Sequence, residues 1–168
     1  MASKESSSGM MARTRHDAIV EFLEGERVPY ELLEHEPAMT AVAEARVAGR
    51  SPDEVAKTVV LHDGRACVIA AIPAGYRLDV HKLRALLGAS RRLQLASEVE
   101  IARDFPSFEV GALPPFGPLV PAAEVIDAAL MKHERILCCA GDHRHSVLVD
   151  PHDVVRMTAA RIADISED

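Results

Sequence analysis

The stretch EVAKTVVLHDGRACVIAAIP, residues 54–73, predicts two β-strands joined by a tight turn. Apolar and β-branched residues fill both halves, which is typical of two strands that pair as a hairpin. Asp63-Gly64 between them is a preferred pair for a two-residue type I′ turn. With that turn, Lys57 lies opposite Ala70, so an ammonium group projects from an apolar strand face beside a small residue.

The position of Lys57 has two explanations. An unpaired charge on an apolar face costs several kcal/mol, so the ammonium group should meet an anion, backbone carbonyl oxygens or a ligand. Alternatively, Lys57 lies at the rim of the sheet, where its long apolar stem covers the surface and its charge stays in water. The hairpin alone leaves both explanations open.

Helices and further strands surround the hairpin. Capping residues and apolar spacing predict helices over residues 15–25, 40–49, 80–88, 97–105 and 151–162. In the second of these helices, Glu44 is expected on the polar face. Strands are expected at 28–35, 135–141 and 145–150, while residues 122–131 fit either structure. This order predicts a mixed α/β (α+β) domain with a mostly antiparallel or mixed sheet, rather than a doubly wound one.

Length and composition narrow the class of protein. The 168 residues fit one domain, expected over residues 15–168, after a Ser-rich flexible tail at residues 1–14. A formal net charge of −7 argues against a protein that coats nucleic acid through bulk charge. No apolar run reaches the roughly 18 residues of a membrane helix, so we expect a cytoplasmic protein. Its three cysteines lie in apolar strand-like runs, which is typical of reduced core thiols.

Basic residues gather locally despite the net negative charge. The segment 76–92 carries one acid, Asp79, against five bases: Arg77, Lys82, Arg84, Arg91 and Arg92. Such a cluster is either a solvated helix face or a site for an anion such as an RNA phosphate.

A second unusual segment is the loop at residues 109–121, EVGALPPFGPLVP. Its glycines permit unusual backbone angles, and Pro114 and Pro115 stiffen it. A rigid loop of this kind could present the backbone N–H groups of Gly111, Ala112 and Leu113 to a carbonyl oxygen or an oxyanion. A plain connecting turn is the other interpretation.

Residues 141–146, GDHRHS, join the last two predicted strands. Alternation would place His143 and His145 on one side, but no third ligand at a typical spacing accompanies them, so we expect no metal. Asp142, His145 and Ser146 are too close in sequence to form a nucleophilic triad. The other histidines in polar surroundings, His35, His133 and His152, are most simply surface residues.

Five stretches together resemble the YbaK/EbsC family of aminoacyl-tRNA deacylases, relatives of the bacterial prolyl-tRNA synthetase editing domain. They are, in order, PYELLEHEPAMTA, EVAKTVVL, RLDVHKLRALLGASRRLQLASEVE, GALPPFG and AGDHRHSVLVDPHDVVRM. The resemblance runs from about residue 16 to 165. It implies a YbaK-like, partly barrel-like sheet flanked by helices, and hydrolysis of the ester that links a wrong amino acid to a tRNA 3′ end, chiefly in tRNA-Pro. It also implies no cofactor, and a protein that acts on aminoacyl-tRNA, with prolyl-tRNA synthetase as a further partner. The acidic net charge and the lack of a long apolar stripe favour a monomer.

The resemblance also assigns roles to residues. The family lysine maps onto Lys57 and the Gly-x-x-x-Pro loop onto Gly111 and Pro115, with Ala112 and Leu113 between them. Substrate-binding positions map onto His35, Thr58, Gly141, Asp142, His145 and Ser146. Some relatives carry Asn at position 58, which bears on the choice of amino acid. We expect tRNA phosphates at Lys82, Arg84, Arg91 and Arg92.

These residues suggest a mechanism without an enzyme nucleophile or a metal, because an ester to a ribose hydroxyl is already activated. Lys57 would anchor the terminal adenosine or the ester, and the loop amides would hold the oxyanion while water attacks. A small pocket would exclude the larger correct amino acid and admit a small one such as Ala or Cys. Two rival functions are a non-catalytic binding module for tRNA or a synthetase, and a hydrolase for another small acyl ester or thioester.

Overall fold

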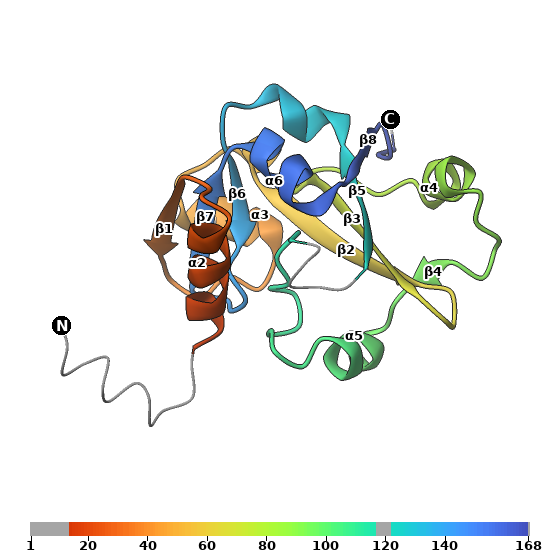
Figure 1. The fold of residues 1–168 in the computed structure, drawn as a ribbon, viewed down its shortest axis with the longest axis horizontal. Coiled ribbons are helices and arrows are strands. Elements are labelled where there is room, and N and C mark those ends of the chain that lie inside the picture. The colour runs from red at the N-terminus through yellow and green to blue at the C-terminus, as the bar shows by residue number, and fades with distance from the viewer. Residues whose placement is uncertain (1–13, 117–121, 168) are drawn as a thin grey trace.

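Two β-sheets with flanking helices make up the computed structural model of the chain (Figure 1), which describes residues 14–116 and 122–167. The helices, with two short 3-10 turns, are α2 (Arg15–Gly25), α3 (Ala41–Val47), η1 (Pro52–Glu54), α4 (Val80–Leu87), α5 (Glu98–Asp104), η2 (Ala128–Lys132) and α6 (Pro151–Thr158). The strands are β1 (Tyr30–Glu34), β2 (Ala56–His62), β3 (Cys67–Pro73), β4 (Gln94–Leu95), β5 (Ala123–Asp127), β6 (Ile136–Cys139), β7 (His145–Val149) and β8 (Arg161–Ala163). Of the predicted tail, residues 1–13 lie outside the described residues, and Thr14 caps α2.

The smaller sheet has three antiparallel strands in the order β1–β7–β6. Its outer strand comes from the start of the chain, since Tyr30 pairs with Val149. The larger sheet has the order β4–β2–β3–β5–β8, in which β5 runs parallel to both of its neighbours. A parallel bridge from Val55 to Leu137 joins the sheets. The mixed α/β fold is therefore confirmed, although the described strands form two open sheets rather than a partly closed barrel.

The central hairpin forms, but the predicted register is wrong. His62 pairs with Cys67, so four residues rather than two connect the strands. The carboxylate of Asp63 accepts hydrogen bonds from the N–H groups of Arg65 and Ala66, both at 2.8 Å, which stabilises the longer turn. Lys57 consequently lies opposite Ile72 instead of Ala70. A shift of two residues leaves Lys57 on the expected face of the sheet.

Local signals place most helix ends correctly. Asp79 and Ser97 accept bonds from the third helical N–H of α4 and α5, as their spacing predicts. Residues 122–131 divide into strand β5 and the turn η2, so both interpretations of this segment hold for part of it. The last helix is shorter than predicted, because Ala159 adopts a positive φ of 56° and ends α6 before β8.

Three apolar clusters form the core. The largest joins α2 and α6, the strands β6 and β7, and one face of β2 and β3, and a second, which includes Leu83 of α4, covers the opposite face of β2 and β3. The third lies under α3 and contains Ala45 and Leu137. In this third region the placement of Glu44 on a polar helix face is wrong, because its side chain is buried, with 2% exposure. Within residues 14–116 and 122–167, no helix is both long and apolar enough to cross a bilayer.

Candidate active site

The loop that precedes the two prolines docks on the turn between β6 and β7. Gly141 donates its N–H to the carbonyl of Ala112 at 3.1 Å, and Glu109 donates its N–H to the carbonyl of Gly141 at 2.9 Å. The carboxylate of Glu109 accepts the N–H of His143 at 2.9 Å. These bonds fix the predicted Gly-x-x-x-Pro loop beside the predicted GDHRHS segment, far from it in sequence.

The loop between β1 and α3 packs against the same turn. His35 donates its N–H to the carbonyl of Arg144 at 2.8 Å, and Ala38 donates its N–H to that of His143 at 2.9 Å. The ring Nδ1 of His143 returns a bond of 3.1 Å to the carbonyl of Ala38. Three of the five stretches that carried the family resemblance therefore meet at one place.

Two glycines at this junction adopt positive φ angles, and a Cβ at Gly141 would in addition be crowded. Gly111 has a φ of +88°, and a Cβ there would lie 3.4 Å from Cε1 of His143 and 3.6 Å from the carbonyl oxygen of Met39. Gly141 has a φ of +92°, and a Cβ there would lie 3.1 Å from atoms of Arg15 and Phe108. The close approach of the loop to the turn thus depends on glycine at both positions.

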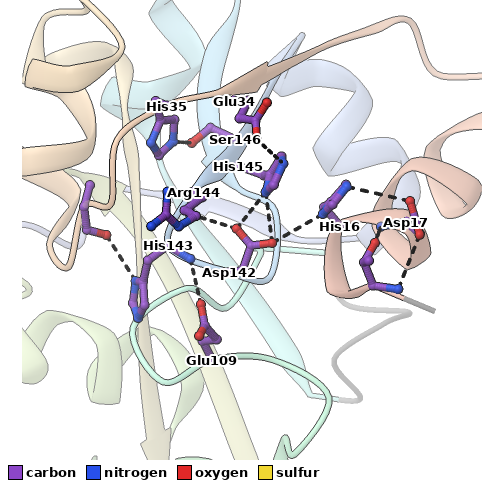
Figure 2. Close-up of polar contacts among 12 residues, drawn as sticks. His16, Asp17, Glu34, His35, Glu109, Asp142, His143, Arg144, His145 and Ser146 are labelled. Carbon is purple, nitrogen blue, oxygen red and sulfur yellow. Dashed lines mark hydrogen bonds and ion pairs between the residues drawn. The ribbon is translucent and has the colours of Figure 1, made fainter. Parts of the chain in front are cut away.

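Asp142 anchors a pair of histidines (Figure 2). Its carboxylate lies 2.9 Å from Nδ1 of His145 and 3.4 Å from Nδ1 of His16, and the two rings stack with centroids 3.7 Å apart. On their other sides, Nε2 of His145 lies 3.8 Å from Glu34 and Nε2 of His16 lies 3.7 Å from Asp17. Burial alone would raise the pKa of Asp142, but hydrogen bonds from His145 and from the N–H of Arg144 lower it below its ordinary value.

Behind the turn lies a buried polar chain. The hydroxyl of Ser146 bonds to the carboxyl group of Glu44, and Nε2 of His35 lies 2.8 Å from the same hydroxyl. The thiol of Cys139 donates to the second oxygen of Glu44 at 3.3 Å. Burial raises the pKa of Glu44, and the bonds from Ser146 and Cys139 offset part of that shift.

Lys57 is the second residue of β2, close to the bridge from Val55 to Leu137 that joins β2 to β6. Its ammonium group donates to the carbonyl oxygen of Tyr76 at 2.7 Å, on the face of β2 that α4 covers. Burial lowers its pKa, and the charge of Arg77 lowers it further. No hydrogen bond joins Lys57 to the described loop residues 109–116. Thr58 points to the opposite face of the strand, so the two side chains line different sides of the sheet.

The four predicted tRNA-binding residues differ in whether their side chains already bond to other parts of the protein. Arg84 donates to the carbonyl oxygens of Leu93 at 2.8 Å and Arg91 at 3.4 Å, and Lys82 donates to Ser166 and pairs with Asp164 at 3.2 Å. These two cations hold α4 to the segments beside it. The side chains of Arg91 and Arg92 are exposed in the turn after α4 and remain suited to a phosphate.

The three proposed oxyanion donors differ in whether their N–H groups already have an acceptor in the protein. Ala112 donates its N–H to the carbonyl of Glu109 at 3.0 Å and is fully buried, so this donor is already occupied. Among the described residues, the N–H groups of Gly111 and Leu113 meet no protein acceptor. Gly111 is exposed, whereas Leu113 and both prolines are buried, and Gly117 lies outside the described residues.

Two side-chain groups have the composition of a metal site. They are His16 with Asp142 and His145, and His62 with Cys67 and Asp104. In the first group, stacked rings cannot both direct an in-plane lone pair at one ion. In the second, Nδ1 of His62 already accepts the N–H of Gly64 at 2.8 Å, and burial beside Asp104 raises the pKa of Cys67 to about 11. Neither arrangement favours a coordinated ion.

Sequence reasoning did not identify Glu44, Cys139 or His16 as parts of this region. A signal for Glu44 existed, because Ala41, Ala45 and Ala48 surround it at helical spacing and form a small-residue face that can be buried. His16 carries no such signal, since α2 reaches the turn only through tertiary packing.

A family model described as an aminoacyl-tRNA editing domain matches residues 35–157. Among solved structures, the hypothetical protein APE2540 superimposes with a TM-score of 0.80 at 25% identity, over 89% of this chain and 99% of that one. A candidate trans-editing enzyme for prolyl tRNA synthetase gives 0.78 at 22% identity, over 94% and 99%. A signal transduction protein from Marinobacter aquaeolei gives 0.69 at 19% identity, over 90% of this chain and 31% of that one. No curated protein sequence matches the chain.

Proposed function

Because the chain belongs to the aminoacyl-tRNA editing domain family, we propose that it hydrolyses the ester bond of misacylated tRNA. The observation that carries this proposal is the family match over residues 35–157, which includes all three segments that meet at the β6–β7 turn. The structural similarity to a candidate trans-editing enzyme for prolyl tRNA synthetase supports tRNA-Pro as the substrate. A small wrong residue such as Ala or Cys would be the amino acid removed.

The loop and the lysine would share the chemistry. The N–H groups of Gly111 and Leu113 are the donors left to hold the ester carbonyl and its oxyanion, and such a donor is worth about 3 kcal/mol. Water attacks the carbonyl, and the tRNA ribose leaves as the alcohol. Lys57 holds the terminal adenosine or the ester after exchanging its bond to the carbonyl of Tyr76 for the ligand.

Substrate selection would combine size with charge. A pocket that admits a small side chain excludes proline, the correct and larger residue. Arg91 and Arg92, both exposed, would contact acceptor-stem phosphates. The protein would act as a monomer in the cytoplasm, with prolyl-tRNA synthetase as its partner.

Lys57→Ala tests this scheme. The variant should lose deacylation of mischarged tRNA-Pro and keep the unfolding temperature of the wild type, because the lysine is only half-buried. Lys132→Ala, which removes an exposed lysine from η2, serves as the control. A panel of tRNAs charged with Ala, Cys, Ser or Pro would define the substrate. Deacylation by Lys57→Ala at the wild-type rate would contradict the role of the lysine, and tRNA binding without ester loss would support a binding module.

A further inference from the structure

The hydrogen bonds that link His35, Ser146 and Glu44 limit which of their atoms can carry a proton. Ser146 is fully buried and Glu44 is 2% exposed, whereas His35 is only partly buried and reaches the surface. Nδ1 of His35 lies 2.8 Å from the carbonyl oxygen of Glu36. A carbonyl oxygen can only accept a hydrogen bond, so Nδ1 must carry a proton.

That constraint leaves two arrangements in which every bond is made. In the first, His35 is neutral, Ser146 donates to its Nε2, and a protonated Glu44 donates to Ser146. In the second, His35 is charged and donates to Ser146, which donates to an ionised Glu44. Both hold the same number of protons. One proton more must lie on Oε1 of Glu44, which faces only the weak acceptor Sγ of Cys139, and one proton fewer leaves either Nε2 or Glu44 without a donor.

We propose that Glu44, Ser146 and His35 form a proton relay that charges His35 when an anionic oxygen of a ligand approaches its imidazole. In this step the O–H bond of Glu44 breaks as Ser146 takes its proton, and the O–H bond of Ser146 breaks as Nε2 of His35 takes that proton. One proton moves along the chain, no electrons are transferred, and none is taken from solvent. Glu44 acts through the other two groups and is therefore a positioning residue.

Several groups around the relay favour a neutral resting state. Burial raises the pKa of Glu44, which favours its protonated form. Cys139 of β6 donates its thiol hydrogen to the other oxygen of Glu44 in both arrangements. The charged or titratable neighbours are His143 of the β6–β7 turn, whose charge acts on Glu44, and Glu36 next to His35. An anion beside His35 shifts the balance towards the charged arrangement, because the new ion pair forms at the exposed end of the chain.

The relay would act at the site of the proposed function, and the identity of the anion that charges His35 depends on that function. His35 begins the loop that packs against the turn carrying Gly141, on which the loop of Gly111 also docks. If the 3′ end of a tRNA binds there, the approaching anion is a phosphodiester of the terminal nucleotides. A site that gains positive charge only upon binding holds RNA without keeping a permanent buried cation in the free protein.

The first test uses the free protein and needs no substrate. Two-bond ¹H–¹⁵N correlation spectra at pH 7.5 should show the ring of His35 neutral, with its proton on Nδ1. Glu44→Gln should give the same ring state, because its amide can donate to Ser146 and accept from Cys139 as the protonated acid does. A ring of His35 that carries its proton on Nε2 would overturn the relay.

The second test adds cytidylyl-(3′→5′)-adenosine, a dinucleotide whose phosphodiester does not titrate near neutral pH. In the wild type, binding should protonate Nε2 of His35, and calorimetry in two buffers of different ionisation enthalpy should show no net proton uptake. In Glu44→Gln the proton must come from the buffer, so the two enthalpies should differ and the Kd at pH 8 should rise about tenfold, the equivalent of one pKa unit. Glu36→Gln, which keeps the carbonyl that fixes Nδ1, should behave as the wild type.

The outcomes separate the two proposals. Proton uptake by the wild type, or a ring of His35 unchanged up to millimolar dinucleotide, would overturn the relay. A protein that shows the relay but hydrolyses no aminoacyl-tRNA would refute the proposed function and leave the relay in place.

Discussion

Lys57 and Arg84 donate to backbone carbonyl oxygens, whereas His16 and His145 at the β6–β7 turn contact the carboxylate of Asp142. The bond from Arg84 to Leu93 changes little with pH, because neither the carbonyl group nor the guanidinium titrates. Burial lowers the pKa of Lys57, whereas hydrogen bonds from His145 and from the N–H of Arg144 hold the pKa of Asp142 below its ordinary value. Helix α4 lies at the right of Figure 1, while β6 and β7 lie at the left.

This difference separates structural charge from charge that can take part in proton transfer. Around α4 a cation satisfies carbonyl groups and fixes a helix in place, so a positive segment in the sequence is no sufficient sign of an RNA contact. Around the turn, paired titratable groups allow protons to move between side chains without loss of a hydrogen bond. Substitutions should therefore affect the two regions through different observables.

The largest expected effect on stability is at Gly141. Gly141→Ala should lower the free energy of unfolding by about 3 kcal/mol, of which roughly 1–2 kcal/mol is backbone strain and the rest overlap with Arg15 and Phe108. Gly64→Ala is the control, because its φ is +95° but nothing lies within 4 Å of the added Cβ. Urea denaturation measures both variants. Equal losses in the two would show that the turn is not tightly packed on α2.

The next effect distinguishes the arginines near α4. Arg84→Gln should lower the free energy of unfolding by about 1–3 kcal/mol, because it removes charged hydrogen bonds to the carbonyls of Leu93 and Arg91. It should leave the KM for aminoacyl-tRNA unchanged.

Charge reversal at Arg91 and Arg92 should have the opposite pattern. The double variant to Glu should raise the KM about tenfold at low salt and weaken its salt dependence, while stability changes by less than about 0.5 kcal/mol. Deacylation kinetics at several salt concentrations measure this effect. An unchanged KM and salt dependence would favour a hydrolase for a small acyl ester.

The smallest expected effect is on the free energy of unfolding at acid pH. Because the folded pKa of Asp142 is below its unfolded value of about 3.9, its contribution is present above about pH 4 and is lost as pH falls through the folded pKa. Asp142→Asn should therefore cost at most about 1 kcal/mol at pH 6 and nothing at the acid end. Chemical denaturation from pH 3 to pH 6 measures the difference. A cost that persists at pH 3 would show that the hydrogen bonds, rather than the charge, hold the turn.

Sequence reasoning succeeded where the physical cause lies within a few residues. The caps Asp79 and Ser97 bond to amides three positions away, so local spacing predicts them. The hairpin register failed because a side chain, that of Asp63, captured two turn amides and lengthened the connection. Turn preference alone does not include this contribution.

The site followed the same rule. Gly111, Asp142 and Ser146 were identified through their resemblance to a family, and the structure brings their segments together. Their contacts with His16 and Glu44 could not be predicted, because each joins residues about a hundred or more positions apart. The bond from Lys57 to the carbonyl of Tyr76 likewise joins residues 19 positions apart, which no local pattern encodes.

The pairing of β1 with β7 has a consequence for synthesis. Tyr30 can find its partner, Val149, only after residues 31–148 have been synthesised. The hairpin of β2 and β3 can form earlier, because only four residues separate its strands. Strand pairs distant in sequence form slowly, so β1 must remain an unpaired strand until β7 has been synthesised. His35 and Ser146, which sit at the end of this pairing, cannot meet before then.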